Sequence, residues 1–323
     1  MPEQAGGSGG GGPSPFTKMV SLSHIQSFFH GRIAVNEPLA PYTSMKVGGP
    51  ADYYLEPRDK DDVVAIVRYL REQQFPFMMI GRGSNMIISD EGYHGAAINL
   101  ENGLSAVSMS GDLVAAEAGA RLTKLVDFCI QNALEGIEWA AGIPGSVGGA
   151  VVMNAGAHGS EMKDHVVDVE ALRGTEVQWV KKEQAGFSYR KSAFSSDVVL
   201  SARFGLAKGN TEEIRRKKSE LIARRNATQP LNLPNSGSMF TNPPGTFAAR
   251  LIEQAGLKGK RIGDAQISEK HANFMVNMGS AKGSDILKLI DLVRRTVYQN
   301  AGVLLEFEVK LVGFSETLKT NPV

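Results

Sequence analysis

Residues 75 to 85 read FPFMMIGRGSN, an apolar run that passes directly into a glycine loop. The run from Phe75 to Ile80 predicts a buried strand, and Tyr53–Leu55 upstream predicts another short strand. Asp59 can cap a helix between the two strands. The apolar face of this helix consists of Val63, Ile66, Val67 and Leu70. The sequence therefore predicts a β-α-β unit that ends at a glycine loop.

The loop itself reads Gly81-Arg82-Gly83-Ser84-Asn85. Its backbone N–H groups can form a concave nest for a pyrophosphate. Met86 stands where a dinucleotide-binding fingerprint needs its third glycine, and no Gly-Lys-Ser/Thr follows, as a P-loop would require. From these residues alone, an anion site and an ordinary glycine turn are equally good interpretations.

A second glycine cluster lies at Ala141–Ala157, with four glycines between residues 142 and 149. Glycine loses more backbone entropy than other residues on folding and packs no side chain. Such a cluster is favoured where a large flat or anionic ligand must approach the backbone closely. A flexible lid is the alternative. The interleaved Ile143, Val147, Val151 and Val152 favour an ordered segment.

Strand and helix candidates alternate through the rest of the first two thirds of the chain. A charged helix from Glu212 to about Ala227, capped by Thr211, marks a boundary after them. A shorter helix has Leu122, Leu125, Val126 and Cys129 on its apolar face. Strands are expected at Ala96–Leu100, Leu113–Glu117, Val166–Leu172 and Val198–Phe204. The result is a mixed α+β domain.

Two helices and a final strand are expected in the C-terminal third. The helices lie near Ala248–Ala255, ended by Gly256, and at Ile286–Tyr298, capped by Ser284. Leu304–Val312 alternates polar and apolar residues, as a half-buried strand does. Glu306, Glu308 and Lys310 would then share one face, and the pattern alone favours a solvated face.

The composition excludes several classes of protein. The 323 residues carry 35 Lys and Arg against 34 Asp and Glu, so the basic excess typical of nucleic-acid binding is missing. The single Cys129 excludes an internal disulfide framework and fits a reducing compartment, which makes the cytoplasm the expected location. The longest stretch without charges, residues 139 to 160, holds six glycines and predicts loops rather than a membrane span. No secretory signal is recognisable.

Two short segments carry reactive groups that no single motif explains. Phe187–Ser192 places the guanidinium of Arg190 beside a phenol, although most surface arginines have no specific role. Asn235–Pro244 carries Ser238 in a turn, and turn chemistry alone explains a serine there. The six histidines lack metal-ligand spacing, and no Gly-x-Ser-x-Gly elbow occurs, so neither a metal site nor serine hydrolase chemistry is expected.

Taken together, six segments occur in an order that resembles the UDP-N-acetylenolpyruvoylglucosamine reductases, a family of bacterial flavoenzymes. They are Gly81–Asn85, Ala141–Ala157, Tyr189–Ser192, Gly237–Phe240, Ser268–Asn273 and Leu305–Val309. The short connection between Arg190 and Glu212 is similar to the compact form of the family, which lacks an extra tyrosine-bearing loop. The likeness spans residues 22 to 313.

The resemblance implies an α+β, vanillyl-alcohol-oxidase-type (PCMH-type) FAD-binding fold. Two α+β subdomains, at about 22–80 and 81–210, would hold FAD, and a C-terminal α+β domain at 211–314 would bind the substrate. Residues 1–21, rich in Gly and Ser, would form a disordered tail, whether native or an added linker. Residues 315–323 would form a second tail.

The family likeness also implies which residues hold the cofactor. Asn85 stands near the place where some related flavoproteins carry a histidine that tethers FAD, so FAD is expected to be non-covalent. The implied FAD-binding residues are Gly81, Arg82, Gly83, Ser84, Asn85, Met86, Gly142, Ile143, Pro144, Gly145, Ser146, Gly148, Gly149, Asn154, Ala155 and Gly156.

The implied reaction is the NADPH-dependent reduction of UDP-N-acetylglucosamine enolpyruvate to UDP-N-acetylmuramate through FAD, a step of peptidoglycan synthesis. Arg190 would bind the substrate carboxylate as a fork, and a protonated Glu308 would donate a hydrogen bond to it. Ser238 would protonate the carbon beside the carboxylate. The implied substrate contacts are Tyr189, Arg225, Asn242, Lys258 and His271.

Two rival interpretations remain open at this point. One is another FAD-dependent oxidase or dehydrogenase of the same fold, which would not need Ser238 and Glu308. The other is a nucleotide-binding module without catalysis. NADPH is expected to enter the substrate's site, because no separate dinucleotide fingerprint occurs. We further expect a monomer or weak oligomer that binds neither nucleic acid nor a membrane.

Overall fold

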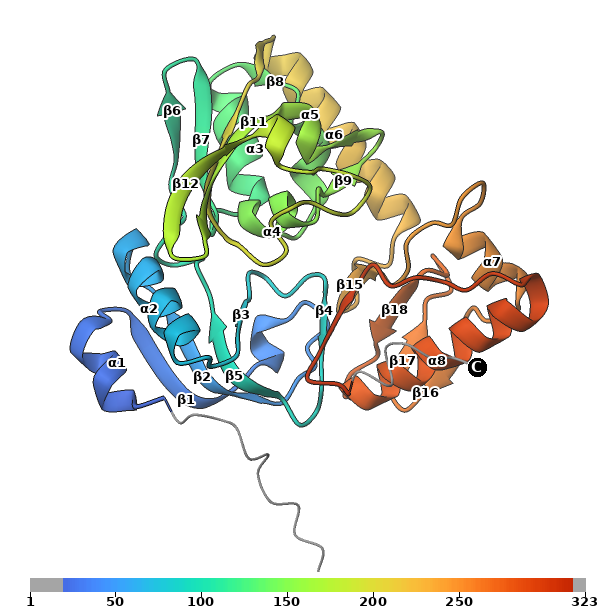
Figure 1. The fold of residues 1–323 in the computed structure, drawn as a ribbon. Helices are drawn as coiled ribbons and strands as arrows, with labels where there is room; N and C mark the ends of the chain where they lie inside the picture. The colour runs from blue at the N-terminus through green and yellow to red at the C-terminus, as the bar shows by residue number, and fades with distance from the viewer. Residues whose placement is uncertain (1–19, 316–323) are drawn as a thin grey trace, which may run out of the picture.

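A computed structural model describes residues 20–315 in three parts, which Figure 1 shows around a common centre. The expected N-terminal tail lies almost entirely outside the described residues, and so does the expected C-terminal tail. Short elements occur between the larger ones. They are η1 Ala40–Tyr42, β8 Leu134–Glu135, η2 Glu138–Gly142, β9 Gly156–Ala157, β10 Ser160–Glu161, α5 Met162–His165, η3 Lys182–Gln184 and β14 Ala207–Lys208.

The first part is a four-stranded sheet with the order β1-β2-β5-β3 and two helices. Its elements are α1 Leu22–Phe28, β1 Arg32–Pro38, β2 Pro50–Glu56, α2 Lys60–Glu72, β3 Phe77–Met79 and β5 Tyr93–Ile98. Asp59 caps α2 by accepting from the Asp62 N–H, as predicted. The apolar face of α2 is buried, also as predicted. The expected β-α-β unit is therefore present, with β5 lying between its two strands.

Two details of this part differ from expectation. The strand expected over Phe75–Ile80 is shorter, and its three residues in β3 are half-buried because they border a cavity. The sheet also includes β5, which is parallel to both β2 and β3. The first sheet therefore extends past the expected boundary near residue 80.

The second part is an antiparallel five-stranded sheet with the order β12-β11-β13-β7-β6. Its elements are β6 Val107–Ser110, β7 Leu113–Glu117, α3 Leu122–Gln131, α4 Val147–Val152, β11 Val166–Arg173, β12 Glu176–Lys181, β13 Val198–Phe204 and α6 Thr211–Thr228. The long helix α6 leads out of this part toward the third (Figure 1). Its cap is Asn210 rather than the expected Thr211, because the Asn210 side chain accepts from two free N–H groups of the first turn.

In the third part, an antiparallel sheet with the order β15-β18-β17-β16 packs with two helices. Its elements are β15 Asn235–Ser238, α7 Ala248–Gln254, β16 Arg261–Ile262, β17 Ala265–Ile267, β18 Phe274–Asn277 and α8 Gly283–Ala301. The expected Ser284 cap of α8 is wrong, because the helix begins at Gly283 and its N-cap is Lys282, so Ser284 lies within the first turn. Asp90 of the first part accepts from the N–H groups of Gly283 and Ser284.

The last strand returns to the first part of the chain. Only Lys310–Val312 forms a strand, β19, and it pairs in parallel with β4, Met86–Ile88. The strand expected from Leu304 bends instead, since the N–H groups of Glu308 and Val309 both donate to the Met239 carbonyl. Glu308 thereby lies beside both β15 and the end of the first glycine loop.

Candidate active site and cofactor site

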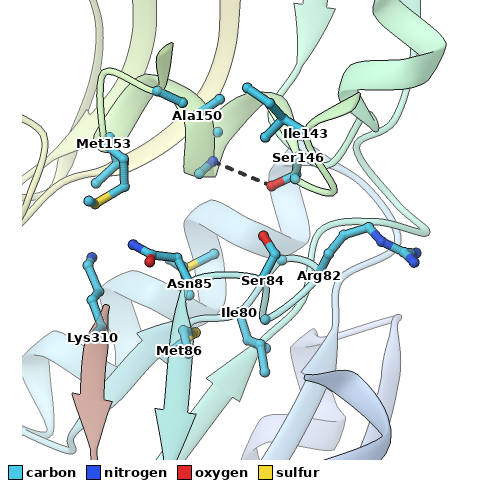
Figure 2. A pocket seen from close by; sticks show the side chains of 18 of the residues that line it. Ile80, Arg82, Ser84, Asn85, Met86, Ile143, Ser146, Ala150, Met153 and Lys310 are labelled. Carbon is cyan, nitrogen blue, oxygen red and sulfur yellow. Dashed lines mark hydrogen bonds between the residues drawn. The ribbon is translucent and has the colours of Figure 1, made fainter. Parts of the chain in front are cut away.

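A cavity of about 550 Å³ lies where the three parts meet. Figure 2 shows its two glycine-containing walls, with Ser84, Asn85 and Met86 on one side and Ser146 and Ala150 on the other. Ser238 of β15, Glu308 and Lys310 of β19 add to the lining. The cavity therefore brings together segments that lie more than 200 residues apart in the sequence.

Most of the residues implied as FAD contacts line this cavity. They are Gly81, Arg82, Gly83, Ser84, Asn85, Met86, Ile143, Pro144, Gly145, Ser146, Gly148, Gly149, Ala155 and Gly156. Two implied contacts are not in the lining. Gly142 packs against Arg225, whose Cδ lies 2.7 Å from where a Cβ on Gly142 would be. Asn154 is completely buried behind the cavity wall.

The first glycine loop lines the cavity and carries unused backbone hydrogen-bond donors among the described residues. Within residues 20–315, no backbone N–H group from Gly81 to Asn85 donates to another residue. Gly83 has φ +54°, and a Cβ on it would meet the Tyr42 carbonyl oxygen at 2.5 Å. Glycine is thus required there to bring the backbone into this position. A run of free N–H donors on one cavity wall fits the diphosphate of FAD.

The second glycine segment is ordered rather than a flexible lid. Ser146 caps α4 by accepting from the Gly149 N–H, and Val147 and Val151 are fully buried. Gly148 packs tightly, since a Cβ on it would lie 2.9 Å from the Ala118 Cβ. Gly149 is exposed to the cavity, and only the Ser146 hydroxyl lies within contact distance of its missing side chain. The backbone of α4 therefore offers a flat, open wall to a ligand.

Replacing Gly149 with valine is expected to weaken FAD binding about 10- to 100-fold, because the new side chain would take up space at the cavity wall, where the nearest atom to its Cβ is the Ser146 hydroxyl at 3.4 Å. The Kd can be measured by flavin fluorescence on protein stripped of its cofactor. Gly149→Ala is the matched control and should have a smaller effect. Unchanged FAD affinity in Gly149→Val, with an unchanged melting temperature, would place the cofactor elsewhere.

Arg190 and Glu308 form an ion pair at the cavity, with 2.7 Å between Nε and Oε1. Arg190 also donates from Nη2 to the Gly156 carbonyl at 3.2 Å, and its guanidinium lies 5.0 Å from the Tyr189 ring centroid. Its backbone has φ +58°, a left-handed conformation that long side chains rarely adopt. Such conformations persist where the surrounding structure holds them, often at functional sites.

The Glu308 carboxyl is held in a low-dielectric position. Burial raises its pKa above the ordinary value, and the guanidinium of Arg190 opposes this rise only in part. The Asn85 side chain donates to the backbone carbonyl of Glu308 at 3.1 Å, so the first glycine loop fixes the position of this residue. Glu308 is therefore a carboxyl group that can be kept neutral close to a cation.

Ser238 ends β15 and lines the same cavity. Gly237 before it has φ +72°, which forms a bulge in the pairing with β18. In the described part of the chain, the Ser238 hydroxyl has no hydrogen-bond partner, which leaves its proton available to a ligand. The three residues implied as catalytic are thus all present in one cavity.

Of the five residues implied as substrate contacts, one lines the cavity and four do not. Arg225 lines the cavity, and its Nε is buried with no hydrogen-bond partner among residues 20–315. Tyr189, Asn242, Lys258 and His271 are outside the lining. Asn242 accepts from the Ala248 N–H, and Lys258 pairs with Glu253. The His271 ring packs edge-on against Phe274.

The sequence analysis did not single out several polar residues that line the cavity, among them Lys310 and Gln229. Lys310 extends from β19 into the lining next to Asn85 (Figure 2), and burial lowers the pKa of its amine. Gln229 lines the cavity near the end of α6, and its Oε1 is buried without a partner in residues 20–315. The alternation of residues 306 to 310 already placed Lys310 on the face of Glu308, so this signal was available. No local pattern indicated Gln229.

Between residues 20 and 315 there is no cluster of His, Cys, Asp or Glu that could hold a metal ion. The same residues contain no helix long and apolar enough to cross a membrane.

The fold and the cavity define an FAD-dependent flavoprotein of the PCMH type, and the FAD binding domain family matches residues 51–178. The family described as UDP-N-acetylenolpyruvoylglucosamine reductase, C-terminal domain, matches residues 229–312.

Relatives that cover most of the chain belong to the same family as these two domain matches. The UDP-N-acetylenolpyruvoylglucosamine reductase of Chloroherpeton thalassium is 43% identical over 92% of this chain and 99% of its own. The one from Caldanaerobacter subterraneus is 43% identical over 88% of this chain and 94% of its own. A crystal structure of the reductase from Thermus caldophilus superposes with a TM-score of 0.76 at 35% identity, covering 88% of this chain and 100% of that one.

The chain belongs to the UDP-N-acetylenolpyruvoylglucosamine reductase family. The predicted family, the α+β PCMH-type fold, the enzyme class and the use of FAD are thereby confirmed. Neither another flavin oxidase nor a non-catalytic nucleotide-binding module is favoured.

Proposed function

We propose that this cavity reduces the enol ether of UDP-N-acetylglucosamine enolpyruvate to UDP-N-acetylmuramate, with Arg190, Glu308 and Ser238 as catalytic residues. The observation that carries the proposal is the presence of a guanidinium, a carboxyl of raised pKa and a hydroxyl with no partner within residues 20–315, all on the same cavity as two glycine-rich walls. When bound, FAD supplies the redox chemistry, taking hydride from NADPH and passing hydride to the terminal CH₂ of the substrate.

Arg190 is proposed to bind the substrate carboxylate. Hydride addition at the CH₂ end leaves negative charge on the neighbouring carbon, and this charge spreads into the carboxylate. A guanidinium stays protonated and can contact both carboxylate oxygens, so it stabilises the charge as it grows. Arg190 already holds a carboxylate, that of Glu308, at 2.7 Å. The substrate carboxylate would compete with Glu308 for this cation.

Glu308 is proposed to act as a neutral hydrogen-bond donor to the substrate carboxylate. As an anion it would repel the developing charge. Burial already raises its pKa, and a bound anion would raise it further while competing for Arg190. The proton taken up by Glu308 thus removes a repulsion and provides a donor in the same step.

Ser238 is proposed to protonate the carbon beside the carboxylate. A hydroxyl is a weak acid at neutral pH, but the acceptor is a strongly basic carbon. Its lack of a partner in the described residues leaves the hydroxyl free to turn toward the substrate. The N–H groups of the Gly81–Asn85 loop and the wall of α4 are proposed to hold FAD non-covalently.

The remaining substrate contacts are proposed for the nucleotide part. Arg225 lines the cavity with a buried Nε that has no partner in the described part of the chain, and its guanidinium suits a diphosphate oxygen. Tyr189, Asn242, Lys258 and His271 would contact the nucleotide beyond the cavity lining. The part from residue 211 to 314 is proposed as the substrate-binding domain, and NADPH is proposed to use the same entrance before the substrate arrives.

The role of Glu308 predicts a pH dependence. Since the neutral carboxyl is the active form, the rate of flavin reoxidation by the substrate should fall about tenfold per pH unit once the pH exceeds the pKa of Glu308. The raised pKa moves this fall to a higher pH than an ordinary glutamate would give. Stopped-flow reoxidation across the pH range measures it.

Glu308→Gln is the control for this prediction. Its amide cannot lose a proton in this range, so the fall with pH should vanish while the rate at low pH decreases. A fall that persists unchanged in Glu308→Gln, or wild-type reoxidation at low pH, would rule out this role for Glu308.

One assay separates the proposed reaction from that of an oxidase. Anaerobic consumption of NADPH should require the enolpyruvyl substrate and yield UDP-N-acetylmuramate in equal amounts. Consumption that depends on oxygen, with no sugar product, would contradict the proposal. We also propose a cytoplasmic monomer or weak oligomer, supported by the nicotinamide reductant and the buried, unpaired Cys129.

A further inference from the structure

Three hydrogen bonds join the end of α4, residues 152 to 156, to the tight turn at residues 188 to 192 that carries Arg190. Ser192 Oγ donates to the Val152 carbonyl at 2.8 Å. Asn154 Nδ2 donates to the Ser188 carbonyl at 2.9 Å. The third bond is the contact of Arg190 with the Gly156 carbonyl described above. The segment that follows the cofactor-facing helix therefore holds the turn with the catalytic guanidinium.

Asn154 makes the middle one of these three hydrogen bonds. Its backbone conformation alone does not require an asparagine at this position. It follows α4 in the left-handed conformation, with φ +40°, and the Ala155 and Asn154 N–H groups close the helix onto the Ala150 and Val151 carbonyls. Glycine meets this backbone requirement without steric strain. The side chain is what distinguishes asparagine from glycine here.

The Asn154 amide is fully buried and fully used. Besides the bond to Ser188, its Nδ2 donates to Glu161 Oε2 at 2.8 Å, and its Oδ1 accepts from the Lys163 N–H at 2.9 Å. Its side chain is fully buried and is not among the residues that line the cavity. Its effect on the reaction must pass through the groups that it holds.

The turn that Asn154 holds contains the strained Arg190. Ser188 and Lys191 exchange two backbone hydrogen bonds, which leaves only Tyr189 and Arg190 at the tip. Arg190, at this tip, has the left-handed φ given above. The buried bond from Asn154 to the Ser188 carbonyl fixes the base of this turn from inside the protein.

We propose that Asn154 is a positioning residue that sets the orientation of Arg190 for the second half-reaction. The inference rests on the role of Arg190 proposed above. Asn154 connects the helix that faces the cofactor to the guanidinium that faces the substrate, and its action is selective. It supports reduction of the enolpyruvyl substrate, whereas reduction of FAD by NADPH does not need it.

Asn154→Gly is the first test, because glycine keeps the backbone conformation and removes only the amide. Anaerobic stopped-flow measurement should show flavin reoxidation by the substrate slowed about 10- to 100-fold, since a displacement of about 1 Å can cost about 10²-fold in rate. Reduction of FAD by NADPH should stay within about twofold of wild type. Wild-type reoxidation in the FAD-loaded variant would overturn the inference.

A double-mutant cycle separates positioning from general damage. In an Arg190→Met background, Asn154→Gly should slow reoxidation less than about threefold further, because both changes remove the same interaction. Effects that multiply would contradict an action through Arg190. If Arg190→Met alone reoxidises at wild-type rate, the proposed role of Arg190 fails and this inference falls with it. If Asn154→Gly slows reoxidation only when Arg190 is present, the result supports both the role of Arg190 and the positioning role of Asn154.

Asn277 provides a matched control. This buried asparagine also makes three hydrogen bonds, to the Met45 carbonyl and from the Gly279 and Ala281 N–H groups, far from the Arg190 turn. Asn277→Ala should lower the melting temperature and leave both half-reactions near wild type. A selective loss of reoxidation in Asn277→Ala would show that instability alone produces the effect.

Asn154→Asp is the second variant, for use if the glycine variant does not retain FAD. Aspartate can donate to the Ser188 carbonyl only when protonated. The reoxidation rate of this variant, expressed as a fraction of the wild-type rate, should therefore rise as the pH is lowered. Reoxidation that matches wild type across the pH range would overturn the inference.

Discussion

Arg190→Met is expected to slow reoxidation of the reduced flavin by the enolpyruvyl substrate about 10²–10³-fold, as loss of one preorganised electrostatic group typically does. Methionine keeps an unbranched apolar stem of similar bulk to the aliphatic part of arginine and removes the charged fork. Reduction of FAD by NADPH should change little, because no carboxylate charge develops in that step. Stopped-flow absorbance separates the two rates on one preparation.

Arg190→Lys is the control for charge against geometry. Lysine restores a positive charge without the planar fork, so it should recover only part of the lost rate. The flavin content of both variants must equal that of wild type. If methionine slows both half-reactions equally, or lysine performs as well as arginine, the bidentate role of Arg190 is wrong.

Ser238→Ala is expected to lower turnover about 10²–10⁴-fold, the range typical of a general acid. NADPH should still bleach the flavin at a rate close to wild type, so the variant would stay reduced in the presence of substrate. The hydroxyl has no partner among the described residues, so its loss should hardly alter the melting temperature.

Ser236 provides a comparison within the same strand. Its hydroxyl is buried and donates to the Met86 carbonyl, which gives it a structural contact that Ser238 lacks. Ser236→Ala should therefore lower the melting temperature more than Ser238→Ala does. It should slow protonation of the substrate less. Equal slowing of both half-reactions in Ser238→Ala would reject the assignment of Ser238 as the acid.

Elements with local signals could be predicted from the sequence. The helix after Asp59 has a side-chain cap and an apolar stripe within one segment, and both are present in the structure. The strands Leu113–Glu117 and Val198–Phe204 are bounded as predicted, because β-branched and apolar runs end at turn residues. These features depend on interactions between neighbours in the chain.

Features that depend on distant partners could not be predicted in this way. The alternation at residues 304 to 312 is correct, yet the Met239 carbonyl bends this segment and only its end pairs with β4. The sequence places Asn154 with the glycine-rich segment implied to bind FAD. Its side-chain amide instead donates to the Ser188 carbonyl, in a turn more than 30 residues later. Side-chain roles of this kind follow only from the folded arrangement.

The most direct measurement reduces the purified flavoprotein with one equivalent of NADPH under anaerobic conditions and then mixes it with UDP-N-acetylglucosamine enolpyruvate. The account predicts that the oxidised flavin spectrum returns and that UDP-N-acetylmuramate forms in an amount equal to the flavin reoxidised. A flavin that stays reduced after mixing, while oxygen restores its colour, would contradict it.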